Sequence, residues 1–272
     1  FGTNSIMVGD NATGTIDAAN NNTGLGVDIF TALTTGDSNS ALGTFSLELL
    51  TTGTGNSAVG YKSLEAVTTG GYNTALGWVA GYKITTGTNN VCIGSTAGDA
   101  ITEGAYNVAV GDNALTSNTT ADNNTAVGAG ALLANTTATD NTSVGYNSLT
   151  ACTTGASNAA FGGNAGGACT TGGGNAFLGD SAGYGNTTGG ANTFVGSAAG
   201  AYGVLTTTGT DNTMVGAYSH ATSATAVNVN VFGRNVAGEQ GYTTIGLDGS
   251  DIRAAHGNVT WATVSDVRVK KD

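Results

Sequence analysis

Apolar, small and polar positions recur along the chain with a period of seventeen residues. Residues 124–140 read NTAVGAGALLANTTATD, and residues 141–157 read NTSVGYNSLTACTTGAS. Numbered from its Asn, each unit has an apolar residue at position 4 and Gly at position 5. Position 8 is Ala or Ser from Ser46 to Ala199, and position 13 is Thr from Thr34 to Thr187. A strict period of this length predicts a stacked-repeat architecture. The position 5 glycines are Gly9, Gly26, Gly43, Gly60, Gly77, Gly94, Gly111, Gly128, Gly145, Gly162, Gly179 and Gly196.

The opening pentad of each unit predicts one short strand. Position 3 is mostly Ala and position 4 is a larger apolar residue, so neighbouring side chains on opposite faces are both apolar or small. No helical spacing of Ala and Leu runs through the Asn and Thr-Thr-Gly segments. The pattern therefore predicts an all-β parallel β-solenoid, or β-roll, with one coil for each seventeen-residue unit.

Stacking of like residues is expected to hold the coils together. Asn over Asn links amides, Thr over Thr links hydroxyls, and the Val and Leu of position 4 pack the interior. The invariant Gly permits a backbone conformation or a close approach that a Cβ would forbid. The residues chosen for these structural roles are Asn56, Gly60, Asn73, Gly77, Asn107, Gly111, Asn124, Gly128, Asn141 and Gly145.

Position 12 changes character along the chain. Apolar residues (Leu33, Leu50, Val67, Ile84, Ile101) give way to Asn118, Asn135, Cys152, Cys169 and Asn186. We expect this column to face inward throughout, with its Asn side chains bonded to neighbouring coils because an unpaired buried amide is unfavourable. Cys152 and Cys169 become vertical neighbours, either as stacked thiols or within disulfide range.

A strand that is apolar on both faces needs a second surface to cover it. In a solenoid one coil wide, the simplest such surface is another copy of the chain. Three-fold symmetry is the natural closed form for a fibre. The sequence thus predicts a homotrimer.

Composition and charge exclude several classes of partner. The chain has 272 residues, with 46 Gly, no Pro and 9% charged residues. Its net charge is −11 and the repeats lack a basic stripe, so nucleic acid and anionic membranes are poor partners. The sequence contains no run of eighteen apolar residues, so membrane insertion is not expected. The three cysteines fit neither a disulfide framework nor a zinc site, and no cofactor is expected.

The repeats resemble a known family of surface proteins. The pentads NSAVG (56–60), NTALG (73–77), NVAVG (107–111) and NTAVG (124–128), each followed three residues later by Ala or Ser, resemble the head repeats of trimeric autotransporter adhesins. That family builds trimers of left-handed parallel β-rolls. The resemblance implies a left-handed roll here, although each coil is longer by about one Thr-Thr-Gly turn.

A second resemblance lies near the end of the chain. The register changes at Gly216, and residues 228–270 resemble the stem before the endosialidase-type intramolecular chaperone of phage and viral tail fibres, whose signature is matched by Ser265, Asp266, Arg268 and Lys270. We expect a shaft over 1–216, an irregular β stem or cap over 217–264, and the start of a chaperone over 265–272, in a piece of a longer protein. The resemblance implies cleavage at Ser265–Asp266 if the chaperone follows, with Ser265 as nucleophile and Lys270 as base.

These features favour a trimeric viral or phage tail-fibre shaft for host attachment, placed on the virion or another extracellular surface. A bacterial trimeric surface adhesin is the alternative, and an ice-binding solenoid with stacked Thr is a minor one. The expected partners are other copies of the chain and a host receptor or glycan. Tyr61, Trp78 and Tyr146 each follow a pentad Gly and are candidates either for sugar stacking or for a trimer seam. No grouping of catalytic residues in the repeats predicts an enzyme.

Overall fold

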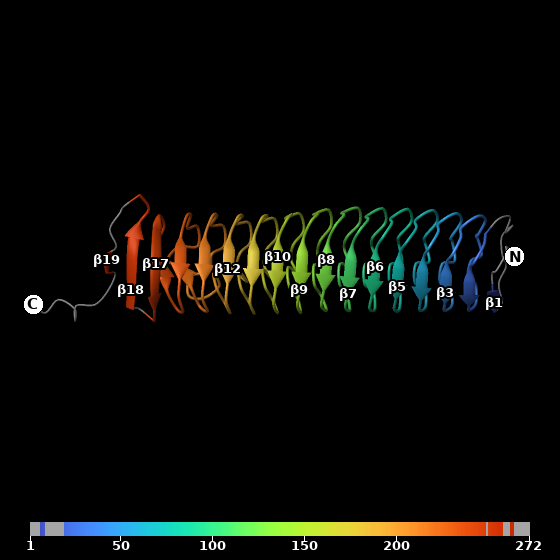
Figure 1. Cartoon of the computed structure of the whole chain (residues 1–272), viewed down its shortest axis with the longest axis horizontal. Coiled ribbons are helices and arrows are strands. Elements are labelled where there is room, and N and C mark those ends of the chain that lie inside the picture. Colours follow the sequence, from blue (N-terminus) through green and yellow to red (C-terminus); the bar gives the residue numbers. More distant parts are fainter. Residues whose placement is uncertain (1–5, 9–18, 249, 258–261, 264–272) are drawn as a thin grey trace, which may run out of the picture. The chain divides into compact units, whose positions relative to one another are not determined.

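The computed structural model describes residues 6–8, 19–248, 250–257 and 262–263 (Figure 1). Every regular element in these residues is a strand, which confirms the all-β class. No helix in them has the length and apolar character needed to cross a bilayer. The strands are β1 (Ile6–Val8), β2 (Thr23–Leu25), β3 (Ser40–Leu42), β4 (Ser57–Val59), β5 (Thr74–Leu76), β6 (Val91–Ile93), β7 (Val108–Val110), β8 (Thr125–Val127), β9 (Thr142–Val144), β10 (Ala159–Phe161), β11 (Ala176–Leu178), β12 (Thr193–Val195), β13 (Thr213–Val215), β14 (His220–Ala221), β15 (Asn230–Phe232), β16 (Ala237–Gly238), β17 (Tyr242–Leu247), β18 (Ser250–Ala255) and β19 (Ala262–Thr263).

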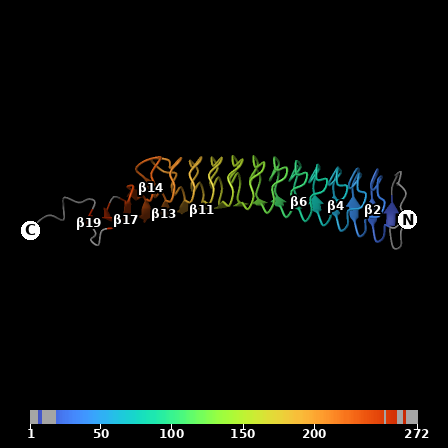
Figure 2. The same ribbon diagram turned by 90° about the horizontal axis from the view of Figure 1, so that it is seen from above.

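The chain divides into two compact units, Phe1–Asn141 and Thr142–Asp272. In the first unit, β1 to β8 pair in chain order, each parallel to the next. Partners are one repeat apart, as in Ser40 opposite Ser57. In Figure 2 the labelled strands β2, β4 and β6 lie along one side of these coils and the turns along the other. The predicted parallel β-solenoid of seventeen-residue coils is confirmed in this unit.

The second unit has the same coil and ends in a hairpin. Its strands β9 to β13 pair in parallel, and the pairing continues past Gly216 to β15 and then β17. The last coil is shorter, because Asn230 lies opposite Thr243. Strand β18 then turns back antiparallel to β17, and β14 and β16 form a separate two-stranded sheet. Stacked coils therefore extend into the region where the sequence register changes.

Four positions of the coil build the interior, namely 3, 8, 9 and 12. In the coil that starts at Asn56, these are Ala58, Ser63, Leu64 and Val67, all fully buried. Position 4 was expected to pack the interior, and that expectation was wrong. Position 4 faces outward, since a strand alternates its side chains and position 3 points inward. The sequence could not choose between the two faces because both are apolar or small.

Two coils of the second unit combine a large residue at position 3 with glycine at position 9. Phe177 and Phe194 occupy position 3, where most earlier coils have Ala. Position 9 of these two coils is Gly183 and Gly200, whereas five earlier coils have Leu there (Leu47, Leu64, Leu115, Leu132 and Leu149). A Cβ on Gly183 would lie 2.3 Å from the ring of Phe177, and one on Gly200 would lie 2.5 Å from the ring of Phe194. Each ring therefore fills the space that a larger side chain at position 9 would need.

The turns use left-handed backbone at non-glycine residues. In the coil from Asn56 to Tyr72, Lys62, Leu64 and Tyr72 have φ of 57°, 52° and 59°. This conformation is unfavourable for side chains with a Cβ and is found where surrounding contacts impose it. Here the next and previous coils supply those contacts, because the Lys62 amide donates to the Thr44 carbonyl and the Leu64 amide to the Ala80 carbonyl.

The threonine column is bonded differently from the expectation. We expected hydroxyls to link to hydroxyls. Instead the Thr34 hydroxyl donates to the backbone carbonyl of Thr51 at 3.0 Å, and Thr51 donates to the carbonyl of Thr68 at 2.9 Å. The hydroxyls of position 13 thus join coils through the backbone, which leaves the more exposed Thr of position 14 facing solvent.

The position 12 column faces inward, as predicted, but the amides of Asn118 and Asn135 bond within their own turns, and the buried side-chain amide of Asn186 has no hydrogen-bond partner. Asn135 is fully buried. Its Nδ2 donates to the Ala138 carbonyl at 3.0 Å, and its Oδ1 accepts from the Ala138 amide at 3.2 Å. Asn118 does the same with Ala121. The expected bonds to neighbouring coils were wrong, because the turn's own amide and carbonyl lie within reach of the short side chain.

Candidate functional site

One regular surface feature is the outward side of the strands, which we call the outer sheet face and define by positions 2 and 4. In the first unit, Leu25, Leu42 and Leu76 are 52%, 46% and 49% exposed. Backbone pairing places these apolar side chains in one column, with Leu25 opposite Leu42 and Leu42 opposite Val59. The column of the first unit comprises Leu25, Leu42, Val59, Leu76, Ile93, Val110 and Val127, and that of the second comprises Val144, Phe161, Leu178, Val195, Val215, Phe232 and Ile245.

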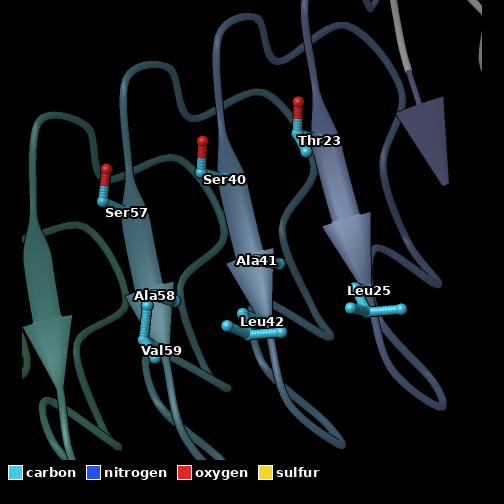
Figure 3. A pocket seen from close by; sticks show the side chains of 8 residues that line it. All are labelled: Thr23, Leu25, Ser40, Ala41, Leu42, Ser57, Ala58 and Val59. Atoms are coloured by element: carbon cyan, nitrogen blue, oxygen red, sulfur yellow. The ribbon is translucent and has the colours of Figure 1, made fainter. Parts of the chain in front are cut away.

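A shallow pocket on this face shows how the side chains of positions 2 and 4 are arranged. It extends over β2, β3 and β4. In Figure 3, Leu25, Leu42 and Val59 form a row at one end of the strands, and small hydroxyl residues form a row at the other. The face is therefore flat and regular, with apolar and hydroxyl rows side by side.

The outer sheet face carries no charge although the chain is strongly acidic. Positions 2 and 4 contain no Asp, Glu, Lys or Arg in any coil from residue 23 to residue 245, whereas the chain has a net charge of −11. Two acidic chains repel each other least where their uncharged surfaces meet. This face is thus an uncharged strip on an acidic chain.

An asparagine ladder fixes each strand beneath the face. Asn56, Asn73, Asn107, Asn124 and Asn141 are all fully buried. In the first unit, Oδ1 of each Asn from Asn22 to Asn124 accepts from the backbone amide of the next Asn. The Asn73 amide, for example, donates to Asn56 Oδ1 at 3.0 Å, while Asn73 Nδ2 donates to the Gly87 carbonyl at 2.9 Å. In the second unit the ladder ends at Asn212, whose Oδ1 accepts from the Val229 amide.

The pentad glycines end the strands in a conformation restricted to glycine. Their φ values are 129°, 148°, 136°, 135° and 136° at Gly60, Gly77, Gly111, Gly128 and Gly145. A Cβ on Gly77 would lie 2.3 Å from the carbonyl oxygen of Gly94 in the next coil. Glycine at this position therefore permits both the turn and the close approach of neighbouring coils.

Two of the three candidate aromatic residues border the outer sheet face of the first unit. Tyr61 and Trp78 occupy position 6 of consecutive coils and are 42% and 56% exposed. The ring of Tyr61 packs edge-on against Phe45 at 5.9 Å. The ammonium of Lys62 lies 5.8 Å from the Tyr61 ring, so part of that ring already contacts a cation of its own chain. Tyr146 belongs to the second unit and is 63% exposed.

Lys62 is fixed beside these rings by a carboxylate. Its Nζ lies 2.9 Å from Oε2 of Glu65, and this pairing raises the pKa of Lys62. The same ammonium lies 5.3 Å from the Phe45 ring and 5.5 Å from the Tyr82 ring. These contacts join three consecutive coils at the surface.

The structure also shows an aromatic cluster that sequence reasoning missed. Tyr202, Tyr218 and His220 meet in the second unit, with ring centroids of Tyr202 and Tyr218 5.0 Å apart. The signal that could have located it is the insertion in the repeat, since Asn192 and Asn212 are separated by 20 residues instead of seventeen.

Two kinds of candidate chemistry are a metal site and the predicted self-cleavage. No group of three His, Cys, Asp or Glu there could hold a metal ion. The predicted cleavage residues Ser265 and Lys270 lie outside the described residues, as do Asp266 and Arg268.

The three cysteines are buried thiols without a disulfide. Burial raises the pKa of Cys92 to about 12 and that of Cys152 to about 11. Burial and the neighbouring Cys152 raise the pKa of Cys169 to about 12. The Cys152 and Cys169 thiols donate to the carbonyls of Gly155 and Gly172 at 3.2 and 3.4 Å.

These raised pKa values predict a loss of stability in alkali. The unfolded thiols deprotonate near pH 8.5 while the folded ones keep their protons, so the free energy of unfolding is unaffected below that pH and falls above it, by up to about 1.4 kcal/mol per pH unit for each thiol. Urea unfolding at pH 8 and pH 10 measures the fall. The triple variant Cys92→Ala, Cys152→Ala, Cys169→Ala should lose less stability between the two pH values. An equal loss in variant and parent would contradict the prediction.

Comparison of the chain with protein-family models, with curated proteins and with solved structures gave no match.

Proposed function

We propose that the chain is a shaft segment of an extracellular fibre of the kind carried by virus or phage particles. Three copies assemble through their outer sheet faces, and the fibre they form serves attachment to a host surface. The observation that carries this proposal is the uncharged, apolar outer sheet face on a chain whose net charge is −11.

The exposed apolar column provides the driving force for assembly. Large contiguous apolar patches on a soluble protein mark interaction surfaces. Burying one half-exposed Leu in a contact contributes about 1 kcal/mol, roughly half of the value for a fully exposed Leu. The column of the first unit supplies seven apolar side chains, of which Leu25, Leu42, Val59 and Leu76 are exposed and the other three are partly buried, and their contributions act together.

The regular repeat makes another copy the best-matched partner. A second chain presents the same apolar row at the same coil spacing, so rows can meet along the whole length of a unit. All coils of a unit run in one direction, and a symmetry axis parallel to the coil stack keeps equivalent coils at the same level. Cyclic symmetry of this type closes, which gives a defined oligomer. The choice of three copies is the simplest in which every chain contacts two neighbours around a central axis.

A paired set of variants tests the role of the outer sheet face. Leu42→Glu with Leu76→Glu places two carboxylates on the face, where assembly would bury them without partners. We expect the variant to sediment as a monomer while its circular dichroism keeps the strand signal of the parent.

The matched control places the same charges elsewhere on the same coils. Thr52→Glu with Thr86→Glu changes exposed position 14 residues, a position where Glu103 occurs naturally. This control should sediment like the parent. Identical sedimentation of both variants would show that the outer sheet face is not the contact between chains.

A further inference from the structure

The coil from Asn192 to Asp211 has three residues more than the usual seventeen. The extra residues belong to an exposed loop, and the backbone hydrogen bond at the base of this loop is kept. In neighbouring coils the position 12 amide donates to the position 9 carbonyl, as Asn186 does to Gly183 at 2.9 Å. In the longer coil the equivalent bond runs from the Thr206 amide to the Gly200 carbonyl at 3.1 Å. Residues 201–205 therefore leave and rejoin the coil at the usual points. Insertions in repeat proteins commonly form binding surfaces of this type.

The loop exposes an aromatic and apolar surface that is held by its neighbours. Tyr202, Val204 and Leu205 are 47%, 41% and 39% exposed. The Tyr202 ring packs edge-on against Tyr218 and, at 5.9 Å, against His220. A side chain on a rigid support loses little conformational freedom when it binds a ligand.

Two glycines allow the loop to lie close to the coil. Leu205 covers Gly185, where a Cβ would lie 2.7 Å from the Leu205 Cβ. Gly203, with φ of 64°, lies over the His220 ring, and a Cβ there would be 3.3 Å from the imidazole. The loop is therefore packed on both sides and presents its Tyr202 ring in a fixed position.

We propose that this platform, defined as Tyr202, Tyr218, His220 and residues 201–205, binds a neutral carbohydrate. A pyranose ring combines an apolar C–H face with hydroxyls around its edge, and it is bound by an aromatic ring flanked by polar atoms. Tyr202 and Tyr218 supply rings with hydroxyl tips. The imidazole is oriented by the contact of its Nδ1 with the Tyr218 carbonyl at 3.0 Å, so that Nε2 is available to a ligand hydroxyl.

Charge and location distinguish this ligand from other occupants. No residue of the platform is acidic or basic apart from His220, and the chain's net charge of −11 disfavours anionic sugars. His220 belongs to the small sheet of β14 and β16, separate from the sheet that carries the outer face. The platform is thus distinct from the outer sheet face, and the inference, which rests on the proposed attachment role, gives that role a ligand class and a place.

Saturation-transfer NMR on the full chain tests this assignment. The probes are hexasaccharides of β-1,4-linked glucose, α-1,4-linked glucose and β-1,4-linked N-acetylglucosamine, with sialyllactose as an anionic comparison. We expect transfer to at least one neutral probe and weaker transfer to sialyllactose. Tyr202→Ala should weaken binding of that probe about tenfold, the upper range for loss of one aromatic contact, and Tyr202→Phe should retain most of it.

Tyr106→Ala is the matched control, because Tyr106 is a more exposed tyrosine that lies outside the platform and outside the outer sheet face. It should leave binding unchanged. The assignment is overturned if no neutral probe shows transfer, if Tyr202→Ala binds like the parent, or if only Tyr106→Ala weakens binding. A change of oligomer mass in Tyr202→Ala would instead make the platform a contact between chains. A trimer that binds no sugar overturns this inference alone, whereas a monomer that binds sugar through Tyr202 overturns only the assembly.

Discussion

Replacing Asn73 by Leu is expected to destabilise the first unit by about 3–5 kcal/mol, because it leaves at least two buried groups without partners at about 1–3 kcal/mol each and adds some strain. Asn73 Oδ1 accepts from the Asn90 amide at 3.0 Å and from Asn90 Nδ2 at 3.1 Å. Asn73 Nδ2 also donates to the Gly87 carbonyl. Leu has a similar size and none of these bonds, so the ladder is interrupted at one coil.

Thermal and urea unfolding, followed by circular dichroism, measure the effect. A loss of this size lowers the melting temperature by about 10 °C in a unit of this length. Thr86→Ala is the control, since Thr86 is exposed and belongs to the same region. It should change the melting temperature by no more than about 2 °C, the range of neutral surface substitutions. Equal effects of the two variants would show that the asparagine ladder does not hold the coils together.

Gly179→Ala is expected to destabilise the second unit by more than about 3 kcal/mol, because left-handed strain and a backbone clash act together. Gly179 has φ of 134°, and a Cβ there would lie 2.7 Å from the carbonyl carbon and oxygen of Gly196. The next coil cannot move away without stretching the bond from the Gly196 amide to the Leu178 carbonyl. Soluble yield and urea unfolding are the measurements.

Gly174→Ala separates the two contributions. Gly174 also has a positive φ of 69°, but the nearest atom to its Cβ would be 3.8 Å away. This control has only the left-handed strain, about 1 kcal/mol. If Gly174→Ala were as destabilising as Gly179→Ala, the close approach of the coils would not be the reason for glycine at position 5.

The repeat was sufficient to predict the coil, its length and its in-register stacking. Period alone fixes which residues become neighbours, so Ser40 opposite Ser57 follows from spacing. Which face of the pentad strand points into the interior was not predictable in the same way. Ala58 and Val59 could each fill the interior, and the structure places Ala58 inside because Leu64 and Val67 already occupy that space. The orientation of the strand depends on the interior space left by side chains elsewhere in the coil, and a local sequence pattern does not contain that information.

The left-handed backbone conformation of several leucines was also not predictable from the sequence. Leu64 and Leu115 have φ of 52° and 55°, a conformation that local propensity assigns to Gly, Asn or Asp. Bonds from adjacent coils impose it, as in the Leu115 amide donating to the Ala131 carbonyl at 3.0 Å. Tertiary stacking overrides the local preference in each of these turns.

The candidate surfaces were only partly predictable. The pentad predicts an apolar column on the surface of the strands, and this column lies on the outer sheet face. The platform at Tyr202 was not recognised, because its three rings lie in two different coils and the repeat numbering separates them. The three-residue break beside Gly200 was visible in the sequence, but its effect depends on the base of the loop, which only the structure shows.

Assembly through the outer sheet face is tested most directly by the molar mass of the full chain in solution. One chain has a mass of 26.5 kDa. Light scattering during size-exclusion chromatography should give three times that value, and the mass should fall to that of one chain when Leu42 and Leu76 are replaced by Glu. A parent chain that elutes with the mass of a single chain at every concentration would contradict the proposed fibre shaft.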